Sequence, residues 1–231
     1  MKKYLTTSNC INCTNSSKCF QKLIHSELEF INENKTQIIY KKGETICKQN
    51  AFASYVMYIA DGLVKLYIES VGNKHINIKI LQTSEFLGLP SVYGENIYNC
   101  SASALKDSTI CLIKKDSFKK LLNHNGNFAS EIIKGYCQNE NRIFDIVKSI
   151  GYKQMHGRIA DTLLYLTSER FKDINIFSYI TRKDIAEFSC ISLESTVRLL
   201  TELRNDKIID IKGKNITILN RELLNKISLH G

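Results

Sequence analysis

The chain lacks any apolar run that approaches the roughly 18 residues a membrane-spanning helix needs. Its first segment, Met1–Asn9, has no apolar core of the kind found in secretory signal peptides. No glycine-rich nucleotide-binding loop follows a predicted strand, and no internal repeat or low-complexity tract occurs. We therefore expect a cytoplasmic protein without a membrane partner, and nothing in the sequence indicates an enzyme.

Length and charge narrow the class of protein. The 231 residues, with 43% apolar content, are enough for two hydrophobic cores and a connector. The net charge of +9 suits a nucleic-acid partner, but residues 151–231 hold 13 basic and 10 acidic side chains, a difference of only +3. Phosphates are contacted by individual cationic side chains and backbone amides, so the local placement of these groups indicates DNA binding better than the net charge does.

An Asn/Ser/Thr-rich arm of residues 1–26, which we expect to be irregular, is followed by short alternating strands. The strands are predicted at residues 37–40, 56–59, 63–68, 76–81 and 109–113, with glycines between several of them. Many short strands with glycine turns indicate an antiparallel roll, or jelly roll, whose interior could hold a ligand. We assign residues 27–124 to this sensory domain.

The period becomes helical over residues 128–150, where apolar side chains recur at Ile132, Tyr136, Ile143, Val147 and Ile150. A helix of this length is roughly 35 Å long, more than a small roll needs to cover. We therefore expect residues 125–150 to pair with a second copy and form a homodimer. The alternative is that the helix only covers its own domain.

Residues 151–231 have the pattern of a winged helix-turn-helix. A helix is predicted over Arg158–Phe171, and Thr181–Arg204 has the pattern of two amphipathic helices joined by a tight turn. Lys207–Leu219 then gives two alternating strands around Gly213. The predicted fold class is α+β, and its C-terminal unit can place a helix in the major groove of double-stranded DNA.

Three of the eight cysteines, Cys10, Cys13 and Cys19, lie in the polar arm. Cytoplasmic thiols stay reduced, which favours metal binding or redox sensing over disulfides. Four thiolates complete either a tetrahedral zinc site or a cubane iron–sulfur cluster, and His25 could also complete a zinc site. The candidates for a fourth thiol are Cys47, Cys100, Cys111, Cys137 and Cys190. The alternative is ordinary buried cysteines, although the arm offers no evident core for them.

Two segments, Lys41–Gln49 and Tyr58–Tyr67, resemble the opening strands of the sensory roll in the CRP/FNR family, named for the cyclic-AMP receptor protein and the fumarate-nitrate reduction regulator. The winged helix-turn-helix resembles that family's DNA-binding domain. The resemblance covers about Cys10 to Glu222 and implies a cyclic-nucleotide-binding-type β-roll, a long dimerisation helix and a C-terminal winged helix-turn-helix. It also implies a transcription regulator that binds palindromic DNA as a homodimer and contacts RNA polymerase.

Within that family, the spacing of Cys10, Cys13 and Cys19 resembles that of the ligands of a 4Fe-4S cluster in the oxygen-sensing branch. The branch takes its fourth ligand from a late roll strand, and the matching stretch here, Ala104–Lys114, carries Cys111. Cys47 and Cys100 are the rival fourth ligands, whereas Cys137 and Cys190 are expected to pack on helices. The resemblance implies that oxygen, and also nitric oxide, acts on the cluster and ends DNA binding.

The residues that bind cyclic AMP in the other branch are replaced in this chain. The family's glutamate becomes Leu89, and its phosphate-binding arginine and serine become Asn99 and Cys100. An amide cannot make the charge-assisted bidentate contact that a phosphodiester needs, so no cyclic nucleotide is expected. Haem binding would rely on His75, which we expect to be a solvated surface group.

The predicted recognition helix carries Glu194 and Arg198 at the positions where family members that read a purine-rich half-site have these residue types. A carboxylate accepts from cytosine, and an arginine bonds guanine bidentately. Val197 stands where the oxygen-sensing branch commonly has a serine, and its methyl groups suit a thymine methyl. Phosphate contacts are expected from Arg182, Ser192, Ser195, Lys212 and Lys214.

Three other functions remain open from the sequence. The first is a regulator of the same fold without a cluster, which senses redox state through thiols or zinc, or another small ligand. The second is a DNA-binding module whose roll responds to nothing. The third, from another class, is an iron–sulfur electron-transfer protein, but the arm has no second cysteine set to support it.

Overall fold

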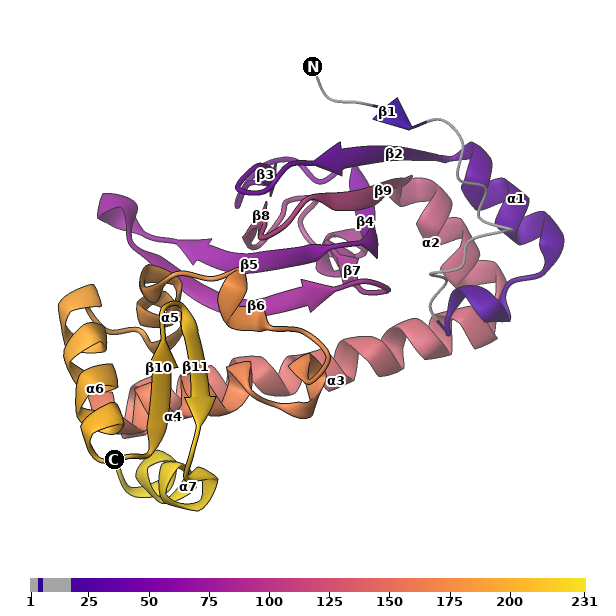
Figure 1. Cartoon of the computed structure of the whole chain (residues 1–231). Helices are drawn as coiled ribbons and strands as arrows, with labels where there is room; N and C mark the ends of the chain where they lie inside the picture. The colour runs from indigo at the N-terminus through magenta and orange to yellow at the C-terminus, as the bar shows by residue number, and fades with distance from the viewer. Residues whose placement is uncertain (1–3, 6–17) are drawn as a thin grey trace. The chain divides into compact units, whose positions relative to one another are not determined.

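The computed structural model describes residues 4–5 and 18–231 (Figure 1). The chain divides into two compact units. The first consists of residues 1–69 and 79–141, and the second of residues 70–78 and 142–231. Among the described residues, no helix combines the length and the apolar character needed to cross a lipid bilayer.

The first unit contains two β-sheets (Figure 1). The five-stranded sheet has the order β1 (Tyr4–Leu5), β2 (Lys35–Tyr40), β9 (Ser108–Lys114), β4 (Tyr55–Asp61) and β7 (Phe86–Leu87). The four-stranded sheet has the order β3 (Thr45–Cys47), β8 (Ser101–Ala104), β5 (Leu63–Glu69) and β6 (His75–Gln82). The central pairs β2–β9, β4–β9 and β5–β8 are antiparallel, which confirms the predicted roll.

Two separate cores lie on opposite faces of the five-stranded sheet. The roll core is formed by both sheets and includes Met57, Ile59 and Ile110. The helix-side core includes Tyr58 and Cys111, which alternate with those residues along β4 and β9. Because successive side chains of a strand point to opposite faces, the burial of both sets means that this sheet is covered on both sides.

Helix α1 (His25–Glu33) precedes β2, and α2 (Lys115–His124) follows β9. The long α3 (Gly126–Tyr152) begins in the first unit and ends in the second. The expectation that residues 1–26 form an irregular arm is wrong at its end. A 3-10 turn forms at Phe20–Lys22, α1 begins at His25, and the helix-side core buries Cys19, Phe20 and Leu23. These apolar side chains supply the burial that orders the segment.

Helix α3 confirms the predicted long helix but changes its apolar stripe. Ile132 is buried in the helix-side core, whereas the next residue, Ile133, is 61% exposed. The exposed outer stripe of α3 includes Ile133, Tyr136, Ile143, Phe144, Val147 and Ile150. Ile132 therefore belongs to the face that packs on the roll, and Ile133 takes its place on the outer stripe.

The second unit is a helix-turn-helix with a β-hairpin (Figure 1). Its elements are α4 (Met155–Leu166), α5 (Arg182–Ser189), α6 (Leu193–Asn205), β10 (Ile209–Lys212), β11 (Asn215–Ile218) and α7 (Arg221–His230). The predicted helix over Arg158–Phe171 ends earlier, at Leu166. The hydroxyl of Thr167 donates to the Leu163 carbonyl, and a separate 3-10 turn follows at Glu169–Phe171. A threonine competing for backbone partners favours such an end.

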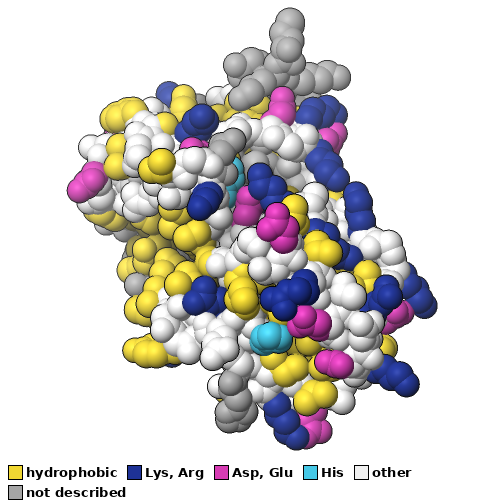
Figure 2. Space-filling view, turned by 90° about the vertical axis from the view of Figure 1, so that its left-hand side faces the viewer, with side chains coloured by type: hydrophobic (Ala, Val, Ile, Leu, Met, Phe, Trp, Pro, Cys, Tyr) yellow, Lys and Arg dark blue, Asp and Glu magenta, His cyan; other side chains and the backbone are white. Residues whose placement is uncertain are grey.

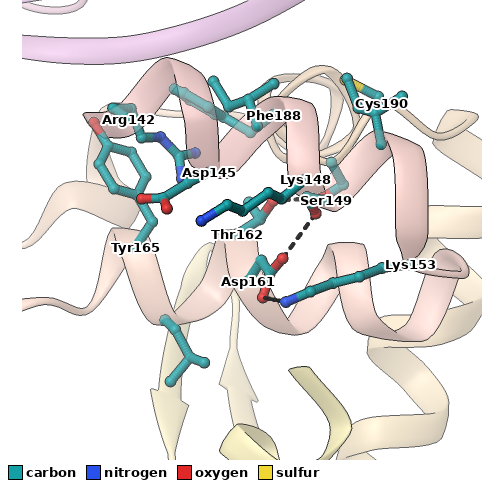
Figure 3. A pocket seen from close by; sticks show the side chains of 14 residues that line it. Arg142, Asp145, Lys148, Ser149, Lys153, Asp161, Thr162, Tyr165, Phe188 and Cys190 are labelled. Atoms are coloured by element: carbon teal, nitrogen blue, oxygen red, sulfur yellow. Dashed lines mark hydrogen bonds and ion pairs between the residues drawn. The ribbon is translucent and has the colours of Figure 1, made fainter. Parts of the chain in front are cut away.

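Asp161 of α4 joins several elements of the second unit (Figure 3). Its carboxylate accepts hydrogen bonds from Ser149 of α3 at 2.7 Å, from Lys153 at 2.8 Å and from Ser228 of α7 at 2.5 Å. Beside it lies a cavity of about 390 Å³, where the Arg142 guanidinium sits 3.9 Å from the centroid of the Tyr165 ring. These contacts fix the end of α3 against α4 and α7.

Candidate functional site

The candidate DNA-reading surface is α6, and local sequence explains how α5 and α6 begin. Thr181 and Asp184 form a reciprocal capping box, with Asp184 N–H donating to the Thr181 hydroxyl at 3.1 Å. The turn between the helices passes through Cys190 in the left-handed region at φ 54°. Ser192 then caps α6 by accepting from the Ser195 N–H at 3.0 Å.

Helix α6 presents Glu194, Val197 and Arg198 on one exposed face. The opposite face buries Thr196, Leu199, Leu200 and Leu203 in the unit. Arg198 forms an ion pair with Glu202 at 3.1 Å, one turn further along the helix. The structure therefore brings the three predicted base-reading residues together, and this face is accessible in the described chain.

The predicted phosphate-contact residues divide into two groups. Lys212 is exposed on the hairpin, and Ser192 and Ser195 lie at the start of α6, where their hydroxyls are 3.0 Å apart. Arg182 instead donates to the carbonyls of Gly213 at 3.1 Å and Lys214 at 3.3 Å. Partial burial lowers the pKa of its guanidinium. Arg182 thus holds the hairpin turn against the start of α5, a contact that the sequence did not suggest.

Two exposed residues on α6 were missed by the sequence reading. Leu193, the first residue of the helix, is 47% exposed, and Thr201 is exposed two turns later. Both lie on the same side as Val197, four residues away in each direction. The sequence did carry a signal for Leu193. It is a large apolar residue directly after the N-cap Ser192, and it lies outside the apolar stripe that α6 buries.

Two of the four proposed metal ligands lie within the described residues. Cys19 and Cys111 are 6% exposed each and belong to the same helix-side core. Cys10 and Cys13 lie outside the described residues. Over residues 18–231 and 4–5 no group of three or more metal-binding side chains occurs, so this part of the chain holds at most half of a four-thiolate site.

An aromatic contact places the end of the arm beside the Cys111 strand. The ring of Phe20, which follows Cys19, meets the ring of Tyr58 edge to face with centroids 4.9 Å apart. Tyr58 is the direct antiparallel partner of Cys111 between β4 and β9. Directly opposed residues point to the same face of a sheet, so the Phe20 ring packs on the face that carries Cys111.

The rival fourth ligands belong to the other sheet: Cys47 ends β3, and Cys100 directly precedes β8. Cys47 belongs to the roll core, where its thiol donates to the Cys100 carbonyl at 3.7 Å, and Cys100 packs against that core. Burial raises the pKa of Cys47 to about 12, and burial also raises the pKa of Cys100. The five-stranded sheet therefore separates these two thiols from Cys19.

Of the two cysteines that were expected to pack on helices, Cys137 lies on α3 and Cys190 lies in the turn after α5. Cys137 is exposed on α3, so the expectation that it packs is wrong for this chain. Residue 137 falls on the outer side of α3, away from the helix-side core that takes Ile132. Cys190 is half-buried in the second unit, and burial raises the pKa of its thiol.

The residues at the family's cyclic-nucleotide position do not fit that ligand. Asn99 is exposed, and the phenol of Tyr98 fills the space beside Gly88 and donates to the Tyr55 carbonyl at 2.9 Å. A Cβ at Gly88 would lie 3.0 Å from the Tyr98 ring. With no cation at Asn99 and Tyr98 buried in the roll core, nothing on this segment balances the charge of a phosphodiester.

His75 is placed differently from its sequence prediction. Its side chain is 23% exposed and lies 3.8 Å from the carboxylate of Glu187 in α5. It is therefore partly buried beside an acid, not solvated. Packing of the β6 start against α5 explains this, since Asn77, two residues on, donates to the Asp184 carbonyl at 3.1 Å.

Comparison with known proteins identifies both parts of the chain. Residues 37–125 match the model of the cyclic nucleotide-binding domain, and residues 157–227 match that of the Crp-like helix-turn-helix domain. The chain is 25% identical to the anaerobic regulatory protein of Bacillus subtilis, covering 86% of each chain. It is 26% identical to the fumarate and nitrate reduction regulatory protein of Yersinia pestis, covering 95% of this chain and 90% of the relative.

Solved structures agree with the fold. FixK2 from Bradyrhizobium japonicum has a TM-score of 0.71 at 22% identity, covering 84% of this chain and 96% of FixK2. A CooA mutant from Carboxydothermus hydrogenoformans has a TM-score of 0.72 at 15% identity, covering 97% of each chain. At these identities the structures support the arrangement of elements alone.

Proposed function

Because the chain belongs to the CRP/FNR family of DNA-binding transcription regulators, we propose that an oxygen-labile 4Fe-4S cluster controls its binding to DNA. The proposed ligands are Cys10, Cys13, Cys19 and Cys111. When bound, such a cluster supplies a redox-sensitive link among four thiolates. The observation that carries the proposal is the burial of Cys19 and Cys111 in one core, on the sheet face opposite Cys47 and Cys100.

The chain's own residues offer a route from the arm to the long helix. Phe20 contacts Phe128 in the first turn of α3, with ring centroids 6.1 Å apart. Phe128 in turn packs edge to face on Phe118 of α2 at 5.5 Å. An arm held against β9 keeps Phe20 in this aromatic group, whereas a released arm withdraws it. The packing at the start of α3 therefore depends on the arm.

We further propose that α3 pairs with α3 of a second copy. Its exposed apolar side chains from Ile133 to Ile150 form one stripe along the helix, and contiguous exposed apolar surface of this kind marks a protein–protein interaction site. Two recognition helices in a symmetric dimer match the half-sites of palindromic DNA only at one spacing, so a change in α3 packing changes affinity. The charge substitution Val147→Glu should give a monomer in sedimentation and weaken DNA binding.

The DNA-contact residues that we propose are those of the α6 face and the adjoining N-caps and hairpin. They are Arg182, Ser192, Glu194, Ser195, Val197, Arg198 and Lys212. Glu194 and Arg198 supply polar base-reading chemistry, Val197 supplies an apolar contact for a thymine methyl, and the others position the helix on phosphates. RNA polymerase is the expected partner of the DNA-bound dimer.

The test is purification of the full chain without oxygen. Iron, sulfide and zinc are quantified, the visible spectrum is recorded before and after air, and DNA binding is measured in both states. About four irons and four sulfides per chain, with bleaching and loss of DNA binding in air, are expected. Colourless protein with stoichiometric zinc, or metal-free protein whose affinity for DNA is the same with and without air, would contradict control of DNA binding by a cluster.

Matched serine variants then test the fourth ligand. Cys111→Ser should lose the cluster and oxygen-dependent DNA binding. Cys47→Ser and Cys100→Ser are the controls, because these thiols lie in the roll core. If Cys111→Ser keeps a full cluster, or if the cluster is lost only in Cys47→Ser or Cys100→Ser, the fourth ligand is not Cys111 of β9.

A further inference from the structure

The exposed face of α6 contains two parallel columns of side chains. One is charged and runs through Glu194, Arg198 and Glu202, with an ion pair closing the last two at 3.1 Å. The other runs through Leu193, Val197 and Thr201 at intervals of four residues. Residues four apart lie one above the other on a helix, so each column is continuous.

The second column presents carbon to the solvent. Leu193 is 47% exposed and Val197 is 49% exposed. The hydroxyl of Thr201 donates back to the Val197 carbonyl at 2.9 Å, which occupies its polar group on the helix itself. Figure 2, viewed from the side on which α6 lies in Figure 1, shows hydrophobic side chains exposed among basic and acidic ones.

The fold of the second unit does not require apolar residues in this column. The buried face of α6 is already complete in Thr196, Leu199, Leu200 and Leu203, each no more than 3% exposed. The neighbouring polar groups are also engaged, since the Ser192 and Ser195 hydroxyls bond to each other at 3.0 Å. The apolar surface at the start of α6 therefore faces whatever α6 contacts.

We propose that Leu193 and Val197 together read the C5-methyl groups of thymine in the major groove. This rests on the proposed placement of α6 on DNA, and it adds Leu193 as a specificity-determining residue. The thymine methyl is the apolar group that a base pair exposes in that groove, and side-chain carbon is its natural contact. Four residues of helix rise about 6 Å, which limits the two methyls to base pairs within about two steps of each other.

The test removes single methyl groups from the DNA. Sites are first selected from random double-stranded DNA with the full chain, purified without oxygen. Each selected thymine is then replaced singly by deoxyuridine, which differs only in lacking the methyl. At the contacted positions the dissociation constant should rise about fourfold per methyl, the effect of exposing one buried methyl-sized group.

Protein variants assign the contact by a double-mutant cycle. Leu193→Ala should weaken binding to the thymine site and abolish the deoxyuridine penalty at one position, and Val197→Ala should do so at the other. Leu229→Ala is the matched control, an exposed leucine of α7 whose loss should leave both affinity and penalty unchanged. Circular dichroism confirms that the variants are folded.

The outcomes separate this inference from the proposed function. If a site is selected but deoxyuridine is tolerated at every position, or Leu193→Ala keeps the full penalty, the methyl-reading role is wrong. If no sequence is enriched under any redox condition, the proposed sequence-specific function fails instead. If the deoxyuridine penalty vanishes only in Val197→Ala, Leu193 does not contact a thymine methyl.

Discussion

The ring of Phe20 meets the ring of Tyr58 edge to face at 4.9 Å, and Tyr58 is the cross-strand partner of Cys111. This contact joins the residue after Cys19 to the strand that carries the proposed fourth ligand. Phe20 also lies 5.6 Å from the ring of Phe86 in β7, so the aromatic group spans the helix-side face of the sheet. The arm and β9 are therefore held together by packing as well as by any shared metal.

Truncation of the Phe20 ring should destabilise the first unit and make the proposed cluster more sensitive to oxygen. Phe20→Ala removes a buried ring and should lower the free energy of unfolding by about 3–5 kcal/mol. When this variant is purified without oxygen and then exposed to air, its visible absorbance should bleach faster than that of the unchanged protein. Phe171→Ala, which empties a buried position of the second unit, is the control for a stability loss alone. Equal bleaching rates in the two variants would count against coupling through Phe20.

Arg182 should affect DNA binding through the hairpin. Arg182→Ala removes the two hydrogen bonds to Gly213 and Lys214, and should lower the free energy of unfolding by about 1–3 kcal/mol. If its role is only to hold the hairpin, affinity for DNA falls while the slope of log K against log salt stays the same. A smaller slope would show that Arg182 itself neutralises a phosphate.

Lys212 should affect DNA binding through a phosphate contact and have no effect on stability. Its side chain is exposed on β10 and forms an ion pair with Asp210 at 3.6 Å. Lys212→Ala should leave the unfolding free energy unchanged but reduce the salt slope by about 0.9 per protomer, as loss of one phosphate contact predicts. Measurements of DNA affinity at several salt concentrations check this. An unaltered slope would place Lys212 off the DNA.

The junction between α3 and α4 depends on Asp161. Asp161→Asn weakens the hydrogen bonds from Ser149 and Ser228 and leaves Lys153 without its counter-charge. We expect the free energy of unfolding to fall by about 1–3 kcal/mol, measured by denaturant titration. Asp173→Asn, at an exposed position of the same unit, should change it little. A similar loss in both variants would mean that the junction contributes nothing specific.

Thiol alkylation should distinguish the cysteines by burial. The pKa of Cys47 is raised to about 12 in the fold, against about 8.5 in an unfolded chain. Between pH 8 and pH 10 the folded thiol therefore stays protonated and should resist iodoacetamide, whereas the exposed Cys137 reacts. In urea Cys47 should react as readily as Cys137. Rapid labelling of Cys47 in native protein, detected by mass spectrometry, would contradict its burial in the roll core.

Several features followed from the sequence because they are local. Alternation over residues 56–59 and 109–113 predicts strands, and three- to four-residue spacing predicts α3, α5 and α6, since each pattern has the period of its element. The exposure of Glu194, Val197 and Arg198 followed from the same period once the buried stripe of α6 was known. The proposed ligand set also began in sequence, from the spacing of Cys10, Cys13 and Cys19.

Only the tertiary structure decided which surfaces meet. Alternation along β9 separates Cys111 from Ile110 but does not say which of them faces the helices, because that depends on which sheet face α1–α3 cover. The same reason explains why Ile132 is buried and Ile133 exposed on α3, and why Arg182 holds a hairpin thirty residues away. A local period defines the faces of an element, whereas long-range packing chooses the partner of each face.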